Sequence, residues 1–496
     1  MSANLSPDIA YNFAKRHGIV LLECGNTATI GLREGADLMP LVEARRVLGR
    51  PIAIEKLSRQ QFDRKLSEAY ADDNLTAVSG AEALGLSGGL GTLIEDMPEA
   101  ADLLESQDDA PIIRLINGLI AEAVRQNASD IHIEPFETAL SVRLRIDGVL
   151  REVLTLPMRL ASPIVSRIKV MARLDIAERR VPQDGRISLG LGGRMLDLRV
   201  STLPARAGER VVLRILDKEQ ASLSLEELGM SLPVLKEFRA ALNEPNGIIL
   251  VTGPTGSGKT TTLYAGLSVL NDATRNILTI EDPVEYAVTG VGQTQVNAKV
   301  GMTFAAGLRA ILRQDPDVVM VGEIRDVETA QIAVQASLTG HLVLSTVHTN
   351  DAAGAITRLR DMGIEPFLLA STLRLVLAQR LLRRLCPQCR EPELAGETAA
   401  RILAAPIGAQ IYSAKGCSHC HNTGYSGRIG VYEALRVGKT IRGLIGEGAN
   451  EDELARAAFA GSHGLKEAAA ALVLQGVTTV EEVLRVTRQE ASHGGT

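Results

Sequence analysis

The chain has 496 residues, too many for one hydrophobic core, so we expect about two to four domains. Hydrophobic residues make up 45% and charged residues 23%, which is ordinary for a globular protein in water. The net charge of −6, the absence of Trp and an aromatic content of 3% argue against a general nucleic-acid binder that stacks bases.

The N-terminal region, residues 1–80, predicts a small α/β module. Residues 19–22 are typical of a short strand, and Phe62, Leu66 and Tyr70 recur at helical spacing. The first residues carry neither a basic cluster nor an apolar stretch, and no apolar run in the chain reaches the length of a membrane span. We therefore predict a cytoplasmic protein whose contact with a membrane is indirect.

A predicted linker, residues 81–108, separates this module from a second domain, residues 109–228. The linker is rich in Gly, Ala and Ser and then in acidic residues, which is typical of a solvated hinge. Beyond it, residues 112–123 follow a helical apolar pattern and residues 129–134 alternate as in a strand. Two predicted hairpins with glycine turns follow, so we expect an α+β domain with an antiparallel sheet.

A third domain, residues 229–440, begins with the most specific motif of the chain. Residues 247–252 predict a buried strand, residues 253–260 match G-x-x-x-x-G-K-[ST], and a helical segment follows. Such a loop points several backbone N–H groups and a helix N-terminus at one phosphate. The predicted nucleotide-binding residues are Gly253, Pro254, Thr255, Gly256, Ser257, Gly258, Lys259, Thr260 and Thr261. Lys259 would contact the β- and γ-phosphates of ATP, and the Thr260 hydroxyl would bind Mg²⁺.

Two further strands of this domain end in carboxylates. Glu281 and Glu285 follow one strand and could bind Mg²⁺ through water or polarise the attacking water, although such an acidic turn alone is usually a surface feature. The sequence does not decide between Glu281 and Asp282 as a metal ligand. Glu323 ends a strand of the Walker B type and is predicted to orient the water. Gly322 stands where an Asp often precedes that Glu, which leaves the metal ligand open.

Two histidines, His341 and His348, border a fourth apolar strand. A single histidine on such a strand is usually a satisfied core residue. Two of them in a nucleotide-binding domain favour a role in sensing the γ-phosphate.

Four of the five cysteines form two C-x-x-C pairs. In a reducing cytosol this pattern favours a metal over disulfides, and the spacing suits a closed tetrahedral Zn²⁺ site. His419 and His421 are alternative ligands, but four thiolates are the simpler set. Because no coordination position would stay open, we expect a structural zinc. The predicted ligands are Cys386, Cys389, Cys417 and Cys420.

Arginines are dense in the second domain and recur in the third. An arginine that faces a phosphate of a neighbouring subunit would act as an arginine finger, and the sequence does not choose among the candidates. The candidates are Arg143, Arg145, Arg199, Arg210, Arg214, Arg309 and Arg313.

In this order, the motifs resemble those of the type II/type IV secretion ATPase superfamily. The phosphate loop, the acidic box 281–285, the strand before Glu323, the two histidines and the four cysteines carry the resemblance, which covers residues 110–487. The cysteine lobe and the single N-terminal module are similar to the general secretion pathway protein E type, the ATPase of type II secretion. A motor that extends type IV or competence pili is the alternative.

The resemblance implies a RecA-like P-loop ATPase domain at 229–440 with an inserted zinc lobe at 384–424, followed by a helical segment at 441–496. It implies a hexamer that binds ATP, Mg²⁺ and Zn²⁺ and powers pseudopilus assembly and protein export. It also implies that an inner-membrane secretion protein holds residues 1–80 through its cytoplasmic domain and that an inner-membrane platform protein is a further partner.

By the same resemblance, Arg199 and Arg214 match arginines that contact phosphates, and Arg309 and Arg313 match arginines near a subunit boundary.

A third interpretation of the chain is a zinc-ribbon module that binds nucleic acid. The acidic net charge and the scarcity of aromatic residues count against it.

Overall fold

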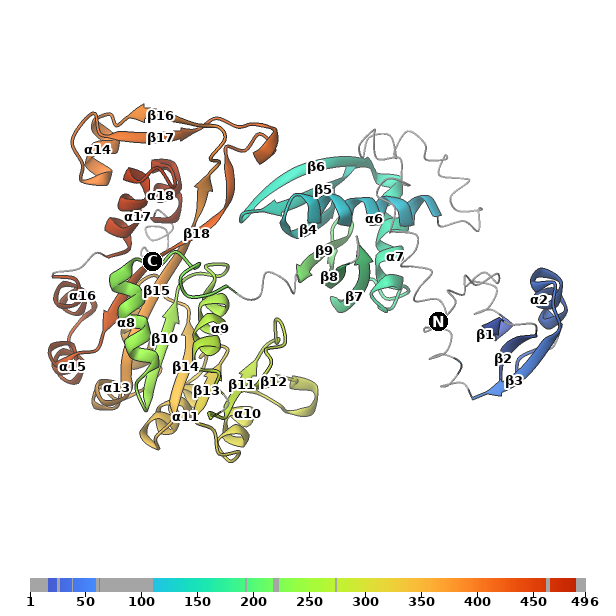
Figure 1. Ribbon diagram of the computed structural model, residues 1–496, viewed down its shortest axis with the longest axis horizontal. Coiled ribbons are helices and arrows are strands. Elements are labelled where there is room, and N and C mark those ends of the chain that lie inside the picture. Colours follow the sequence, from blue (N-terminus) through green and yellow to red (C-terminus); the bar gives the residue numbers. More distant parts are fainter. Residues whose placement is uncertain are drawn as a thin grey trace. The chain divides into compact units, whose positions relative to one another are not determined.

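The chain forms two compact units, residues 1–217 and 218–496, which are described here one at a time. The structure is a computed structural model (Figure 1). It describes residues 17–24, 27–37, 39–58, 62, 110–191, 194–216, 223–272, 274–460 and 464–487. The predicted linker and the predicted helical positions Leu66 and Tyr70 lie outside these residues.

In the described part of the N-terminal module, a three-stranded sheet in the order β1-β2-β3 packs with helix α2. Its elements are β1 (Ile19–Cys24), β2 (Ala28–Arg33), α2 (Pro40–Leu48) and β3 (Ile52–Leu57). Pro40 suits the first turn of α2, and Gly49 ends the helix with a φ of 61°. The predicted strand over residues 19–22 is confirmed. Buried residues from all four elements, together with Phe62, form a core of the module's own.

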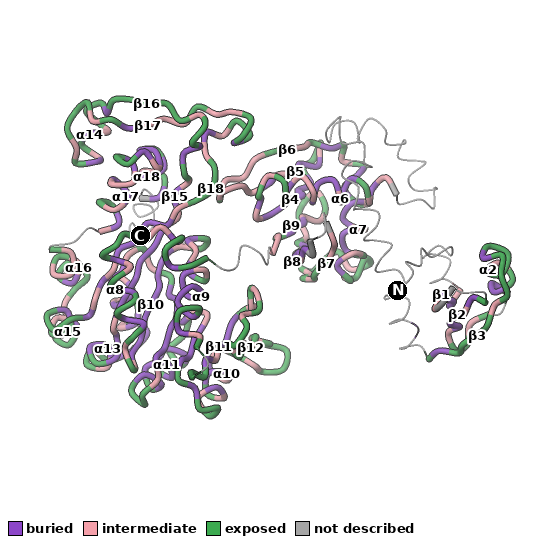
Figure 2. The backbone as a smooth tube through the Cα atoms, viewed as in Figure 1, coloured by how far each residue is buried: buried purple, intermediate pink, exposed green. Residues whose placement is uncertain are grey.

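Residues 110–216 form an α+β domain whose sheet has the order β6-β5-β4-β9-β8-β7, with every neighbouring pair antiparallel. The predicted antiparallel sheet is therefore confirmed. Its elements are α6 (Ala110–Arg125), β4 (Ala128–Pro135), β5 (Ala139–Ile146), β6 (Val149–Pro157), a 3₁₀ turn (Met158–Leu160), α7 (Ala161–Met171), β7 (Gln183–Leu191), β8 (Arg194–Ala205) and β9 (Gly208–Leu216). Helices α6 and α7 cover one face of the sheet and bury its apolar side chains (Figures 1 and 2). Asp147 and Gly148 turn the β5–β6 hairpin with φ values of 48° and 83°.

The second unit is built on a seven-stranded sheet in the order β12-β11-β13-β14-β10-β15-β18. All neighbours are parallel except β15 and β18, which form a long antiparallel hairpin. Its strands are β10 (Gly247–Thr252), β11 (Ile277–Glu281), β12 (Val291–Gln295), β13 (Val318–Val321), β14 (Leu342–Val347), β15 (Leu373–Leu385) and β18 (Tyr425–Arg436). The predicted strands at the phosphate loop, the acidic box, Glu323 and the histidine pair are all present.

Helices cover both faces of this sheet. Residues of α8 and α9 form one core with one face of the central strands, and residues of α10 to α13 form another with the opposite face. Along β10, Ile249 and Val251 belong to the first core and Ile248 and Leu250 to the second, as expected for a strand buried on both sides. The helices are α8 (Leu232–Leu242), α9 (Lys259–Leu270), α10 (Phe304–Ile311), α11 (Val327–Leu338), α12 (Ala352–Asp361) and α13 (Pro366–Thr372), with a 3₁₀ turn at Ala298–Val300.

The segment before α8 belongs to the core of the second unit. Leu225 and Leu228 pack with α8 and β10 residues rather than with the α+β sheet. The two compact units divide at residue 217. The domain boundary at residue 228 stays a prediction.

Within the described residues, a small lobe and four C-terminal helices complete the second unit. The lobe lies between β15 and β18, and its hairpin is exposed along β16 (Figure 2). Its elements are β16 (Arg390–Leu394), α14 (Glu397–Leu403), β17 (Gln410–Ala414) and a 3₁₀ turn (Ser418–Cys420). The helices are α15 (Lys439–Gly446), α16 (Glu451–Phe459), α17 (Leu465–Leu474) and α18 (Val480–Thr487). Among the described residues, no helix has both the length and the hydrophobicity needed to cross a membrane.

Candidate active site and metal centre

The phosphate loop joins β10 to α9, as the sequence predicts. Gly256 and Gly258 have φ values of 78° and 87°, a conformation that favours glycine. Gly258 is also the N-cap of α9, which begins at Lys259, so the loop ends at a helix N-terminus. Thr255 and Gly256 are exposed at the tip, and Thr260 is exposed in the first turn of α9. The loop can therefore present backbone N–H groups and the Thr260 hydroxyl to a bound anion.

Lys259 is buried within this loop. Its Nζ donates hydrogen bonds to the carbonyl oxygens of Gly253 at 2.7 Å and Pro254 at 3.1 Å, and lies 3.4 Å from Nδ1 of His348. Burial lowers the pKa of Lys259 to about 8, with Glu323 opposing this shift and Arg380 adding to it. Among the described residues the ammonium contacts carbonyl and imidazole dipoles rather than a carboxylate, so an anion in the loop would stabilise its charge.

Glu323 and His348 lie beside Lys259, because β10, β13 and β14 are parallel and end at the same edge of the sheet. One oxygen of Glu323 pairs with Arg325 at 2.5 Å, and the other lies 3.3 Å from Nε2 of His348. Burial, together with the charge of Lys259, lowers the pKa of His348 below its ordinary value, so the ring is neutral at pH 7. Arg325 escaped the sequence analysis, although it stands two residues after Glu323.

Glu281 lies at the end of β11 and is buried in a polar network. Its carboxylate accepts hydrogen bonds from the hydroxyls of Tyr264 and Thr279, the latter at 2.5 Å, and from the Gln293 amide at 3.2 Å. These donors come from α9, β11 and β12, so Glu281 joins the helix after the phosphate loop to two neighbouring strands. Glu285 lies exposed in the loop that follows β11.

The two predicted histidines lie at opposite ends of β14. His348 follows the strand at the phosphate-loop edge, whereas His341 precedes it, about 20 Å away for six extended residues. Nδ1 of His341 lies 2.8 Å from the Ala336 carbonyl and 3.1 Å from the Thr339 hydroxyl. Within one chain the structure therefore brings His348, but not His341, to Lys259.

The predicted arginines of the first unit share one face of the α+β sheet. Arg199 and Arg214 are cross-strand neighbours on β8 and β9, and the Arg214 guanidinium donates to Asp130 at 2.9 Å. Arg143 and Arg210 both pair with Glu134 on β4. Their neighbours along each strand are buried under α6 and α7, so these charges lie on the sheet face opposite to the helices.

One side chain that contacts the phosphate loop was not found from the sequence: Gln379 on β15. Its amide contacts Ser257 of the loop and Thr262 of α9. The next residue, Arg380, donates to the carbonyl oxygen of Asn350 at 2.6 Å, just beyond His348. The available signal was one amide residue in a strand that otherwise holds only apolar residues and arginines, which does not reveal the contacted segment.

The four predicted cysteine ligands come together in the lobe. Their sulfur atoms all lie within 4.8 Å of one another, with separations of 3.9, 3.7 and 3.8 Å for the pairs 386–417, 389–420 and 417–420. A tetrahedron of thiolates about 2.3 Å from Zn²⁺ has edges of about 3.8 Å, so the set fits that ion. Although burial opposes it, hydrogen bonds from the backbone N–H groups of Cys417 and Gly424 lower the pKa of Cys420 to about 6.

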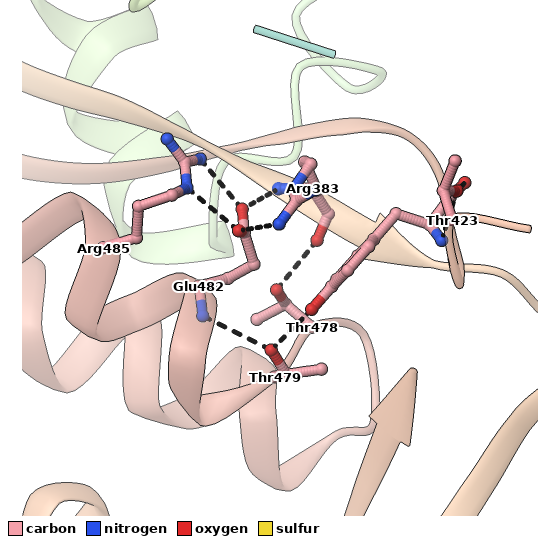
Figure 3. A network of polar contacts seen from close by, with 7 residues as sticks. Arg383, Thr423, Thr478, Thr479, Glu482 and Arg485 are labelled. Atoms are coloured by element: carbon pink, nitrogen blue, oxygen red, sulfur yellow. Dashed lines mark hydrogen bonds and ion pairs between the residues drawn. The ribbon is translucent and has the colours of Figure 1, made fainter. Parts of the chain in front are cut away.

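A polar network centred on Glu482 stabilises the end of β15, from which the chain enters the lobe (Figure 3). The Glu482 carboxylate of α18 accepts from the Arg383 backbone at 3.1 Å, its guanidinium at 2.6 Å and Arg485 at 2.9 Å. The Arg383 guanidinium also lies 4.0 Å above the ring of Tyr425. The Arg383 carbonyl accepts from the Thr478 hydroxyl at 2.8 Å. The C-terminal segment thereby bonds the part of β15 that extends beyond its pairing with β10.

Sequence comparisons with known proteins all find proteins of secretion systems. The sequence profile of the family described as Type II/IV secretion system protein matches residues 105–485, and the profile of an N-terminal domain of GSPII protein E matches residues 8–70. Type II secretion system protein E of Pseudomonas aeruginosa is 57% identical over 484 residues, covering 97% of this chain and 96% of the relative. Type II secretion system ATPase E of Vibrio cholerae is 53% identical over 488 residues, covering 97% of both chains.

Solved structures have the same fold. The pilus retraction motor PilT, solved with bound ADP, is similar with a TM-score of 0.51 and 28% identity, over 74% of this chain and 95% of that one. The Legionella pneumophila ATPase DotB is similar with a TM-score of 0.56 and 20% identity, over 75% and 95%. These likenesses confirm the predicted fold class, a P-loop ATPase domain preceded by an α+β domain.

Proposed function

The chain belongs to the family of type II/IV secretion system proteins, and from this membership we propose that it is the ATPase of a type II secretion system. It would hydrolyse ATP to power pseudopilus assembly and protein export. Relatives that carry the name type II secretion system protein E, more than half identical over nearly the whole length, support this choice over a pilus-extension motor. The arrangement of Lys259, Glu323 and His348 around the phosphate loop is the observation that carries the enzymatic part.

In the proposed reaction, the phosphate loop binds the β- and γ-phosphates of ATP. Lys259 exchanges its two carbonyl partners for phosphate oxygens, a favourable exchange because the buried ammonium gains a full opposite charge. Glu323 orients and deprotonates the attacking water, while neutral His348 contacts it from the side of the γ-phosphate. Mg²⁺, when bound, neutralises phosphate charge, and the exposed Thr260 hydroxyl would be its ligand from the chain.

Other residues have roles that we propose on the family likeness. Arg199 and Arg214 would contact phosphates from the α+β domain, and Arg309 and Arg313 would lie near a subunit boundary of a hexamer. Thr261 would contact the nucleotide, and Glu285 would act near the metal. His341 would act across a subunit boundary, because it lies at the far edge of its own sheet.

The binding partners and the location of the enzyme are also proposals. Residues 1–80 would bind the cytoplasmic domain of an inner-membrane secretion protein, which would recruit the ATPase to the membrane from the cytoplasm. The match of residues 8–70 to an N-terminal domain of protein E supports this role. An inner-membrane platform protein would be the second partner, and no nucleic acid is needed.

The four cysteines would hold a structural Zn²⁺. The sulfur separations fit a tetrahedral ion, and four thiolates leave no open position for a substrate. The ion would stabilise the lobe between β15 and β18 and take no part in hydrolysis.

Replacement of Lys259 by Ala tests the enzymatic proposal. We expect at least a hundredfold lower ATP turnover, because one full charge of the phosphate site is lost. The measurement is phosphate release by the full chain, with circular dichroism as the check of folding. Lys236→Ala on the exposed side of α8 is the matched control and should keep wild-type turnover. Full turnover in the folded Lys259→Ala variant would refute the assignment.

A further inference from the structure

Gln379 supports the phosphate loop from the neighbouring strand. The side chain is 1% exposed. Its Nε2 donates to the Ser257 carbonyl at 2.5 Å, and its Oε1 accepts from the Thr262 hydroxyl at 2.8 Å. Ser257 belongs to the loop and Thr262 to the first turns of α9, so a single amide spans the junction of loop and helix.

Two glycines of the loop lie against this strand. A Cβ added to Gly253 would lie 2.5 Å from the Gln379 carbonyl oxygen, and one added to Gly258 would lie 3.2 Å from Nε2. The pairing of β10 with β15 ends at Thr252 and Ala378, so Gln379 is the residue that faces the start of the loop. The glycines therefore permit both the loop conformation and its close approach to Gln379.

The geometry of a peptide unit explains how this contact acts on a ligand. In a trans peptide, the C=O and the following N–H point in opposite directions. Because the Ser257 carbonyl points at Gln379, the Gly258 N–H points away from β15. Without the Gln379 donor, this peptide could rotate and turn a carbonyl dipole toward the phosphate, which would repel it.

We propose that Gln379 is a positioning residue for nucleotide binding, which fixes the Ser257–Gly258 peptide with its N–H directed at the phosphates. This inference rests on the proposed ATPase function. Gln379 touches no reacting atom, so its loss affects affinity for ADP and ATP more than the chemical step.

Calorimetry with Mg-ADP and steady-state ATPase kinetics on the full chain test the inference. Gln379→Met keeps the length of the side chain and removes the amide. We expect the ADP dissociation constant and KM to rise about tenfold, the size expected for a lost buried hydrogen bond whose carbonyl partner stays unpaired. We expect kcat to change less than threefold. Gln379→Glu should weaken binding at least as much, because a carboxylate oxygen would face the Ser257 carbonyl.

Matched variants separate positioning from general damage to the core. Leu382→Met changes a fully buried residue of the same strand to the same side chain and should keep wild-type affinity. Thr262→Val removes the second hydrogen bond while Gln379 stays, and should weaken ADP binding several-fold. Thr262→Ser keeps the hydroxyl and should restore the affinity.

The outcomes distinguish this inference from the proposed function. A wild-type chain that binds neither ADP nor ATP overturns both. A wild-type chain that binds ADP, with unchanged affinity in the Gln379 variants, overturns the inference alone. A lower melting temperature without a change in KM or in the dissociation constant assigns Gln379 a purely structural role and also overturns it. If the Gln379 variants do not fold, equal affinities of Thr262→Val and Thr262→Ser overturn it.

Discussion

Burial gives Lys259 its chemical character. Its ammonium lies among carbonyl dipoles, and desolvation lowers its pKa to about 8. A phosphate oxygen is a better partner than a carbonyl because it brings a full negative charge. The phosphate loop is therefore organised around a cation that gains more from an anion than a solvated lysine would.

Glu323 is held by two basic groups, Arg325 and His348, on its two oxygens. We predict that Glu323→Gln lowers kcat by about a hundredfold or more, because an amide cannot accept the proton of the attacking water. The isosteric amide should leave the ADP dissociation constant within about twofold. Steady-state ATPase kinetics and calorimetry measure the two quantities.

Glu397→Gln on the exposed start of α14 is the control for the Glu323 variant and should behave as wild type. An unchanged kcat for Glu323→Gln would show that another group activates the water.

At the scale of elements, β15 combines three tasks. It carries Gln379 at the phosphate loop, Arg383 in the Glu482 network and, at its end, the chain that enters the cysteine lobe. Beyond Ala378 it loses β10 as a neighbour, and Val477 and Thr478 bond its backbone instead. At the start of α18, Thr479 accepts a hydrogen bond from the Glu482 backbone, whereas the Glu482 carboxylate bonds Arg383.

We predict that Glu482→Gln destabilises the second unit. Although burial opposes it, hydrogen bonds from Arg485 and Arg383 lower the pKa of Glu482 to about 2, from an ordinary 4.5. This shift corresponds to a stabilisation on the order of 3 kcal/mol. The loss should lower the melting temperature of the second unit by about 5 °C or more in calorimetry.

The same shift predicts a pH dependence. A carboxylate with a lowered pKa stabilises the fold fully above its unfolded pKa, and the contribution disappears as the pH falls through the folded value. The difference between wild type and Glu482→Gln should thus be full above about pH 4.5 and vanish toward pH 2. Glu481→Gln, an exposed neighbour on the same turn, should leave stability unchanged. A pH-independent difference would contradict the ion-pair explanation.

Local patterns predicted much of this architecture and a part of the site. The strand before the phosphate loop and the helix that starts at Lys259 were predictable, because glycine spacing and a continuous apolar run specify them locally. Gln379 was not, because its contacts depend on strand register. Arg325 was not, because the sequence does not show that its side chain turns back to the Glu323 carboxylate. His341 was grouped with His348 because both border one apolar strand, although only His348 follows the carboxyl end of that strand, where the phosphate loop lies.

At the scale of the whole molecule, the described parts have separate cores. The core of the N-terminal module consists of residues from within 19–62, and the core of the α+β domain consists of residues from within 112–213. The cores of the second unit consist of residues of that unit. Each core is closed by helices of the same part. Loss of one part should therefore leave the others folded.

We predict that a chain starting at residue 110 keeps ADP affinity within about twofold of the full chain, because the phosphate loop and its supports all lie in the second unit. It should no longer bind the cytoplasmic domain of the proposed inner-membrane partner. Calorimetry with Mg-ADP and a pull-down with that domain are the measurements. Retained capture of the truncated chain would place the partner's binding surface elsewhere.

The pairing of Leu385 with Tyr425 defines the place of the cysteine lobe in the topology. The two residues pair at the tip of the β15–β18 hairpin, so the residues between them form an insertion in the turn of that hairpin. A short reverse turn grafted there would leave the order of the sheet unaltered, with Glu323 and His348 on the same framework. The lobe is thus an insertion into one hairpin, and it is anchored to the rest of the second unit because Ala395, Leu403 and Ile411 belong to the same core as strands β10 and β13.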